Sequence, residues 1–160
     1  MSGEIVAPDV QSYNASNVTR ASITFDAGVG SGAVATGYVN LFSITGKVLV
    51  RAIMPYCVTD LTGAAATLAL GVTGNTGGFV AATVGTTIDA DEFWVTTTPT
   101  ANLIALPAAC KDIMVGASAD PTPGIFLTIA VADVTGGNLA VTVFWDAITS
   151  GAKITSSINT

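Results

Sequence analysis

The sequence contains no histidine, and only five of its 160 residues are lysine or arginine. Without histidine, the Ser-His-Asp and Cys-His catalytic arrangements are excluded in their usual forms, as are histidine-based zinc sites. The formal net charge is −6, so the chain repels phosphate groups. We therefore expect neither nucleic acid nor an anionic membrane surface as a partner. The basic residues form no run in the sequence: Arg20, Lys47, Arg51, Lys111 and Lys153.

Long hydrophobic runs are also missing, because no stretch reaches the roughly 18 apolar residues that a transmembrane helix needs. The first residues, MSGEIVAPD, include an early acid and no apolar segment, so we expect no secretory signal and synthesis in a reducing cytoplasm. There, Cys57 and Cys110 are predicted to be small buried hydrophobic residues. A disulfide between them and metal ligation remain as alternatives.

Charged residues make up only 10% of the chain, against about 25% in a typical globular protein. Alanine, valine, threonine and glycine are abundant instead, and no apolar stripe at helical spacing persists over ten residues. Short alternating runs rich in β-branched residues follow one another, separated by glycine, proline and asparagine. We count about nine or ten such strands. The sequence therefore predicts an all-β fold, an antiparallel β-sandwich or jelly-roll-like barrel.

Individual runs give more specific predictions. In the run 47–61, alternate residues from Val48 to Tyr56 are predicted to share one face, with Pro55 marking a bend, a bulge or a sheet edge. The runs 66–72, 125–131 and 139–145 are predicted to form much of the core. Leu70 and Phe144 are expected to be buried there.

The last two long runs are separated by Thr135-Gly136-Gly137, which predicts a hairpin with a short loop. Residues 18–150 are predicted to form one domain, preceded by an extended arm at 1–17 and followed by a polar tail at 151–160.

The predicted arm can add a strand to the exposed sheet edge of a sister copy or of another protein subunit. The alternative is a disordered terminus with no role. Ile5, Val6 and Val10 are its interface candidates, since they can fill pockets between strands.

The densest group of charges is in the stretch TTIDADEFWVTTT, residues 86–98. Asp89, Asp91 and Glu92 are weak candidates for a cation site, and weaker ones for catalysis. The preferred interpretation is an acidic turn that precedes the entry of Phe93 and Trp94 into the core. We predict no catalytic residues, no cofactor and no metal.

Residues 40–150 resemble small β-rich structural proteins of tailed bacteriophage virions. The likeness is carried by LFSITGKVLVRAI, VTDLTGAAATLALGVTGNTGGFVAATVGTTIDADEFW and GIFLTIAVADVTGGNLAVTVFWDAI. This resemblance implies a capsid decoration or cement protein without enzyme activity. It would be located on the capsid surface of the virion after synthesis in the host cytoplasm. Its expected partners are the major capsid protein or other virion proteins, and it would form a homo-oligomer, most plausibly a trimer.

A second hypothesis is a head-fibre or tail-associated module that binds glycans of the host surface. Such a module needs exposed aromatic rings in a groove or at a tip, and the chain has only five Trp and Tyr residues. The copy number and position of the chain on labelled particles would distinguish the two hypotheses.

Overall fold

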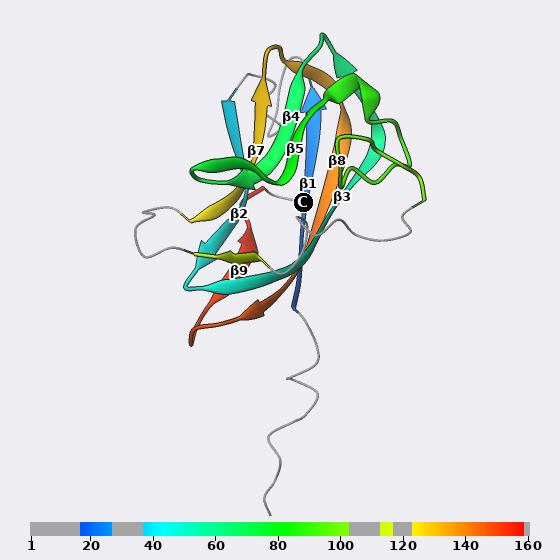
Figure 1. The fold of residues 1–160 in the computed structure, drawn as a ribbon. Coiled ribbons are helices and arrows are strands. Elements are labelled where there is room, and N and C mark those ends of the chain that lie inside the picture. Colours follow the sequence, from blue (N-terminus) through cyan, green and yellow to red (C-terminus); the bar gives the residue numbers. More distant parts are fainter. Residues whose placement is uncertain (1–16, 27–36, 103–112, 117–122, 159–160) are drawn as a thin grey trace, which may run out of the picture.

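The computed structural model describes residues 17–26, 37–102, 113–116 and 123–158, and these residues form two packed antiparallel β-sheets (Figure 1). The described part contains no α-helix, and its one helical element is the 3-10 turn η1 (Gly85–Thr87). The all-β prediction is therefore confirmed. The strands are β1 (Asn17–Asp26), β2 (Gly37–Thr45), β3 (Val48–Gly63), β4 (Thr67–Val72), β5 (Asn75–Val84), β6 (Ile113–Val115), β7 (Gly124–Ala130), β8 (Val134–Ala147) and β9 (Lys153–Ser156).

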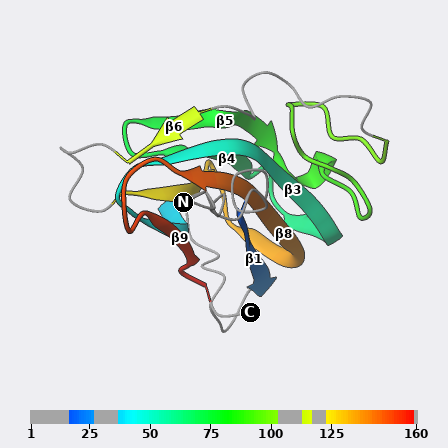
Figure 2. The same ribbon diagram turned by 90° about the horizontal axis from the view of Figure 1, so that it is seen from below.

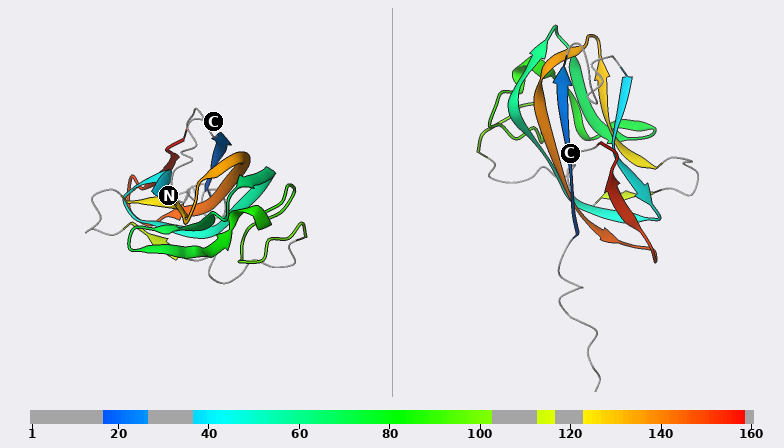
Figure 3. Two further views of the ribbon diagram at one scale, coloured as in Figure 1. Left: turned by 90° about the horizontal axis from the view of Figure 1, so that it is seen from above. Right: turned by 180° about the vertical axis from the view of Figure 1, so that it is seen from behind.

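One sheet, called sheet A here, has the strand order β1-β8-β3-β6, and the other, sheet B, has the order β5-β4-β7-β2-β9. The central strands of sheet A are long, with 16 residues in β3 and 14 in β8. Figure 2 and the left view of Figure 3 show these two strands curling around the molecule, so that sheet A resembles half of a barrel.

The core lies between the two sheets and follows the alternation of the strands. Inward residues of sheet A, such as Ile23 and Val141, face inward residues of sheet B, such as Leu70 and Leu127. All four are fully buried. The segments predicted to form much of the core are confirmed in that role. Leu70 has no exposed surface, as predicted.

Two consecutive hydrogen bonds join the edges of the two sheets where β1 lies near β9 (Figure 3, right). The Trp145 indole N–H donates to the Thr19 hydroxyl at 2.9 Å, and that hydroxyl donates to the Ile154 carbonyl at 3.2 Å. The edge strands of the two sheets are thus tied together on this side.

The predicted face of the run 47–61 is correct for its first half only. Val48 and Val50 are buried, but from Ala52 onward the buried positions are Ile53, Pro55 and Cys57. The cause is a β-bulge: Val50 pairs with Trp145 and Ala52 with Phe144, which leaves Arg51 as an extra residue on β3. An extra residue exchanges the two faces of everything that follows.

The prediction that Phe144 is buried in the core is wrong. Its neighbours Val143 and Trp145 point inward, whereas Phe144 is half-buried on the outer face of sheet A. Alternation leaves only every second residue for the core, and the apolar run 143–145 does not reveal which residues those are.

The predicted hairpin through Thr135-Gly136-Gly137 is also wrong. These three residues lie inside β8, where Gly136 pairs with Asp26 and Thr62. β7 belongs to sheet B and β8 to sheet A, so the link at 131–133 crosses from one sheet to the other. Successive strands of a sandwich often lie in different sheets. Gly136 and Gly137 lie at the end of β8 where bulges shift its pairing with β3.

Part of the predicted polar tail forms strand β9, which pairs with β2 and buries Ile154. At the other end, β1 begins at Asn17, and the arm with Ile5, Val6 and Val10 lies outside the described residues. Among the residues described, no helix has the length and hydrophobicity to cross a membrane.

Candidate binding surfaces

The acidic stretch forms a turn in which the carboxylates of Asp91 and Glu92 accept hydrogen bonds from other groups of the chain. A Glu92 carboxylate oxygen accepts from the backbone N–H of Asp89 at 3.1 Å, and the Glu92 N–H donates to the Asp89 carbonyl at 3.3 Å. Asp60, from β3, accepts from the Ala90 N–H at 2.5 Å. These bonds fix the backbone of the turn and join it to β3.

Asp91 has a positive φ of 64° and accepts a 2.7 Å hydrogen bond from the Tyr56 hydroxyl. Aspartate tolerates this left-handed conformation better than most residues. The hydrogen bond to Asp91 raises the pKa of Tyr56, because it favours the protonated phenol. Asp91 therefore positions an aromatic side chain on the outer face of β3.

The structure brings Asp89, Asp91 and Glu92 into one turn but not into a ligand cluster. Within the described ranges, no group of three or more histidine, cysteine or acidic residues could hold a metal ion. The geometry agrees with the structural interpretation of the stretch, in which the acids shape a turn.

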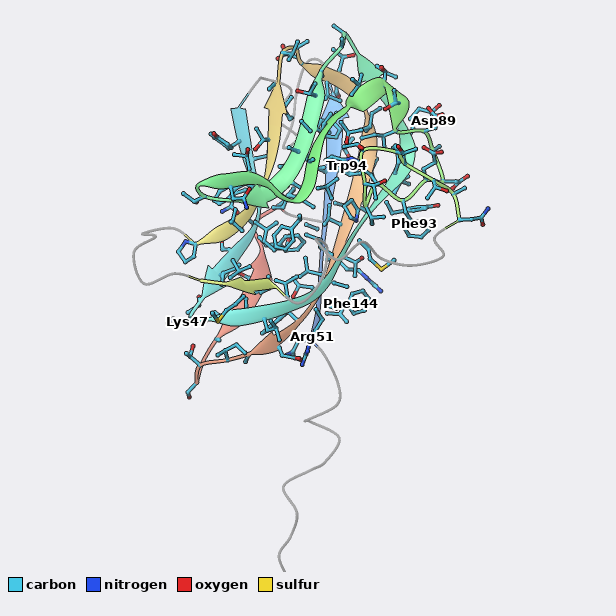
Figure 4. All side chains as sticks on the ribbon, viewed as in Figure 1. Lys47, Arg51, Asp89, Phe93, Trp94 and Phe144 are labelled. Atoms are coloured by element: carbon cyan, nitrogen blue, oxygen red, sulfur yellow. The ribbon has the colours of Figure 1, made fainter. Side chains whose placement is uncertain are left out.

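The two aromatic residues after the turn point in opposite directions (Figure 4). Trp94 is fully buried, and its indole N–H donates to the buried Thr83 hydroxyl at 2.9 Å. Phe93 stays half-buried outside the core. The prediction that both residues enter the core is thus correct for Trp94 and wrong for Phe93, because neighbours in an extended segment face opposite sides.

The segment 91–94 runs along the edge of β3 and explains the position of Pro55. The Trp94 N–H donates to the Pro55 carbonyl at 3.0 Å, and Cys57 exchanges backbone hydrogen bonds with Asp91 and Glu92 at 2.9 and 2.8 Å. Because N–H and C=O of a strand residue point to the same side, the N–H that Pro55 lacks would face this segment and not β8.

Cys57 is a free, fully buried thiol, as predicted for a small hydrophobic residue. Burial, and next the charge of Asp60, raises the pKa of this thiol from 9.0 to about 11. The thiol donates toward the carbonyls of Thr59 at 3.2 Å and Ile88 at 3.5 Å. It is therefore a packing residue with little thiolate at neutral pH. Cys110 lies outside the described residues.

One candidate surface is a shallow hollow of about 610 Å³ on the outer face of sheet A, which we call the sheet A hollow. Its floor comes from the outward residues of β3 and β8, and one wall comes from the segment after the acidic turn. The residues that line it are Arg20, Met54, Tyr56, Asp91, Phe93, Ala101, Ala140, Thr142 and Phe144.

Aromatic and sulfur-containing side chains dominate this hollow. The rings of Tyr56 and Phe93 lie against each other, with centroids 5.1 Å apart and planes tilted by 52°. Phe144 is on the same outer side of the sheet (Figure 4), and Val18, which pairs with it across β1 and β8, is 48% exposed. Arg20 and Asp91 supply one charge of each sign.

The described lining of the sheet A hollow suits contact with an apolar protein surface. Half-buried aromatic and methionine side chains are typical of protein interfaces, where they lose their remaining exposure on contact. Sequence reasoning missed this site because the bulge at Arg51 decides that Met54 and Tyr56 face outward. The one signal available was the apolar character of both faces of β3 and β8.

Comparisons of the chain with models of protein families, with curated proteins and with solved structures give no match.

Proposed function

We propose that this chain is a structural protein of a tailed-bacteriophage virion, a decoration or cement protein that binds the outer face of the capsid lattice. The observation that carries the proposal is the sheet A hollow, an apolar sheet face that no other described element covers, with Met54, Tyr56, Phe93 and Phe144 in its lining. The resemblance of residues 40–150 to small virion proteins supports the same function.

The charge distribution favours apolar docking over salt bridges. With five basic and 11 acidic residues in the whole chain, few ion pairs with a partner are available. The ion pair between Arg51 and Asp146, at 2.6 Å, is already made within sheet A and is largely exposed. Exposed ion pairs of this kind contribute little, so affinity must come from buried apolar area and shape.

A shell lattice is a suitable partner for such a surface because it offers the same weak contact many times. A hollow of this size buries a modest area per copy, and one contact alone gives limited affinity. Self-association of the chain, which we propose as part of the same function, would join several hollows into one multivalent unit. Multivalent binding gives stable attachment without any strong individual contact.

The test is shell binding by a variant that places a charge in the hollow. Shells assembled from the major capsid protein of the encoding phage are incubated with wild-type chain, Phe144→Lys or Ile148→Lys, and sedimented. Ile148 is 52% exposed and does not line the hollow, so it is a matched control for the added lysine. We expect Phe144→Lys to bind at least about tenfold more weakly and Ile148→Lys to bind like wild type. Equal binding of Phe144→Lys, with an unchanged melting temperature, would refute this docking face.

A further inference from the structure

A second hollow lies on the outer face of sheet B, on the opposite sheet from the sheet A hollow. Its volume is about 300 Å³, and it is lined by Tyr38, Val72, Thr73, Gly74, Thr76 and Phe126. These residues come from β2, β7 and the ends of β4 and β5 with the turn that joins them. Figure 1 shows this turn beside β7 and β2. We call this hollow the sheet B pocket.

The glycine-rich sequence GVTGNTGG, residues 71–78, builds one wall of this pocket. A side chain at Gly71 would collide with the Asn75 carbonyl oxygen, so only glycine lets the turn fold back onto the sheet. Gly74 forms the tip of the turn with a positive φ of 80°. The result is a wall of backbone groups and of two exposed threonines, Thr73 and Thr76.

Two aromatic rings contribute, with Val72, to the apolar part of the pocket. Tyr38 is 70% exposed, which is unusual for a large ring in a sheet, and Phe126 is half-buried beside it. The far end of the Phe126 ring lies 3.1 Å from where a Cβ on Gly124 would be, so the glycine makes room for the ring. The pocket thus has an exposed tyrosine and a fixed phenylalanine.

None of the described residues that line the pocket is charged, which argues against a phosphate, carboxylate or ammonium ligand. The adjoining strands also carry two buried oxygens without hydrogen-bond partners, Asn40 Oδ1 and Thr128 Oγ1. Asn40 pairs with Phe126, and Thr128 pairs with Tyr38, so both flank the pocket without lining it. Because both oxygens are buried outside the lining, a ligand in the pocket is not expected to contact them, and it is held by the neutral side chains and the backbone groups of the lining.

From these features we infer that the sheet B pocket binds one ring of a neutral saccharide. The apolar face of a sugar ring can stack on Tyr38 and Phe126, while its hydroxyls bond to Thr73, Thr76 and the backbone of the turn. A volume of about 300 Å³ is at the lower end of ligand pockets, which suits a single ring. This site is independent of the proposed shell contact, because it lies on the other sheet.

The test is a titration of isotope-labelled full-length chain with glucose, galactose, mannose and N-acetylglucosamine, followed by NMR. We expect at least one sugar to shift resonances of residues 72–76 and Phe126, with a dissociation constant on the order of a millimolar. Glucuronic acid should bind more weakly than glucose, since no cation lines the pocket and the chain is acidic.

Three variants make the result specific to the pocket. Tyr38→Ala should weaken binding about tenfold by removing the exposed ring, and Thr76→Val should weaken it while keeping the shape of the turn. Met114→Ala, an exposed residue of sheet A, should leave binding unchanged. The inference is overturned if none of the four sugars shifts these resonances. The inference is also overturned if the sugar binds folded Tyr38→Ala with the same affinity as it binds wild type.

Discussion

At the scale of single residues, Leu70 and Phe144 show how much depends on which side of a strand a residue occupies. Leu70 is fully buried between the sheets, whereas Phe144 is half-buried on the outer face. We expect Leu70→Ala to lower the free energy of unfolding by about 2–5 kcal/mol, because it leaves a cavity. Phe144→Ala should lower it by only about 1 kcal/mol, since the site opens to water. Chemical denaturation measures both, and an equal or larger loss for Phe144→Ala would contradict the assigned faces.

The buried thiol of Cys57 makes stability depend on pH in a defined direction. The folded state raises the pKa from 9.0 to about 11, so folding favours the protonated thiol. This contribution is fully present below about pH 9 and is lost as the pH rises toward about 11. We expect wild type to lose more unfolding free energy across that window than Cys57→Ala does. Tyr56 titrates in both proteins, and the charge of Cys57 is the smallest of the causes that raise the pKa of Tyr56, so most of its effect cancels in the difference. Parallel pH profiles would contradict the prediction.

Asp91 is predicted to be important for its backbone conformation and not for its charge. Asparagine tolerates a φ of 64° and can still accept from Tyr56, so Asp91→Asn combined with Asp89→Asn should change stability by less than about 0.5 kcal/mol. Asp91→Val should cost about 1–3 kcal/mol, because a β-branched residue is strained there. Thermal melting distinguishes these outcomes. A marked loss of stability of the wild type on adding a chelator would instead support a bound cation.

At the scale of elements, strand β9 gives the C-terminal segment a structural role, although most of its residues are polar. Ile154 is 5% exposed and packs in the core cluster, while its neighbour Thr155 faces solvent. We expect Ile154→Ala to cost about 2–4 kcal/mol of unfolding free energy and Thr155→Ala to stay within about 0.5 kcal/mol. If Ile154→Ala melts like wild type, β9 contributes nothing to the core.

The strands and several of their faces were predictable from the sequence, but the change of face at a bulge and the neighbours of each strand were not. Alternating β-branched runs reveal a strand, because the side-chain period of two is a local property. The bulge at Arg51 depends on how β3 pairs with β8, which involves residues about 95 positions away. The crossing at 131–133 likewise depends on packing between sheets, and a glycine pair inside β8 gave a misleading turn signal.

The same limit applies to the candidate sites. The acidic turn was visible in the sequence, because its residues are contiguous and favour turns. The sheet A hollow collects Arg20, Met54, Phe93 and Phe144 from four separate segments, so it exists only after the strands are paired. The sequence predicts Phe144 in the core, whereas its position on the outer face of sheet A makes it a candidate interface residue.

At the scale of the whole molecule, the two sheets present surfaces of different character. The sheet A hollow is broad, shallow and aromatic, whereas the sheet B pocket is small and partly lined by threonines and turn backbone. A decoration protein attached through sheet A would leave the outer face of sheet B directed away from the shell. The two proposals are therefore compatible in one particle.

A reconstruction of the virion of the encoding phage, with the chain placed in density, is the most direct test of shell binding through the sheet A hollow. We predict many copies distributed over the capsid lattice, with Met54, Tyr56, Phe93 and Phe144 covered by a shell subunit. Copies confined to a vertex or the tail, or a sheet A hollow exposed to solvent, would contradict it.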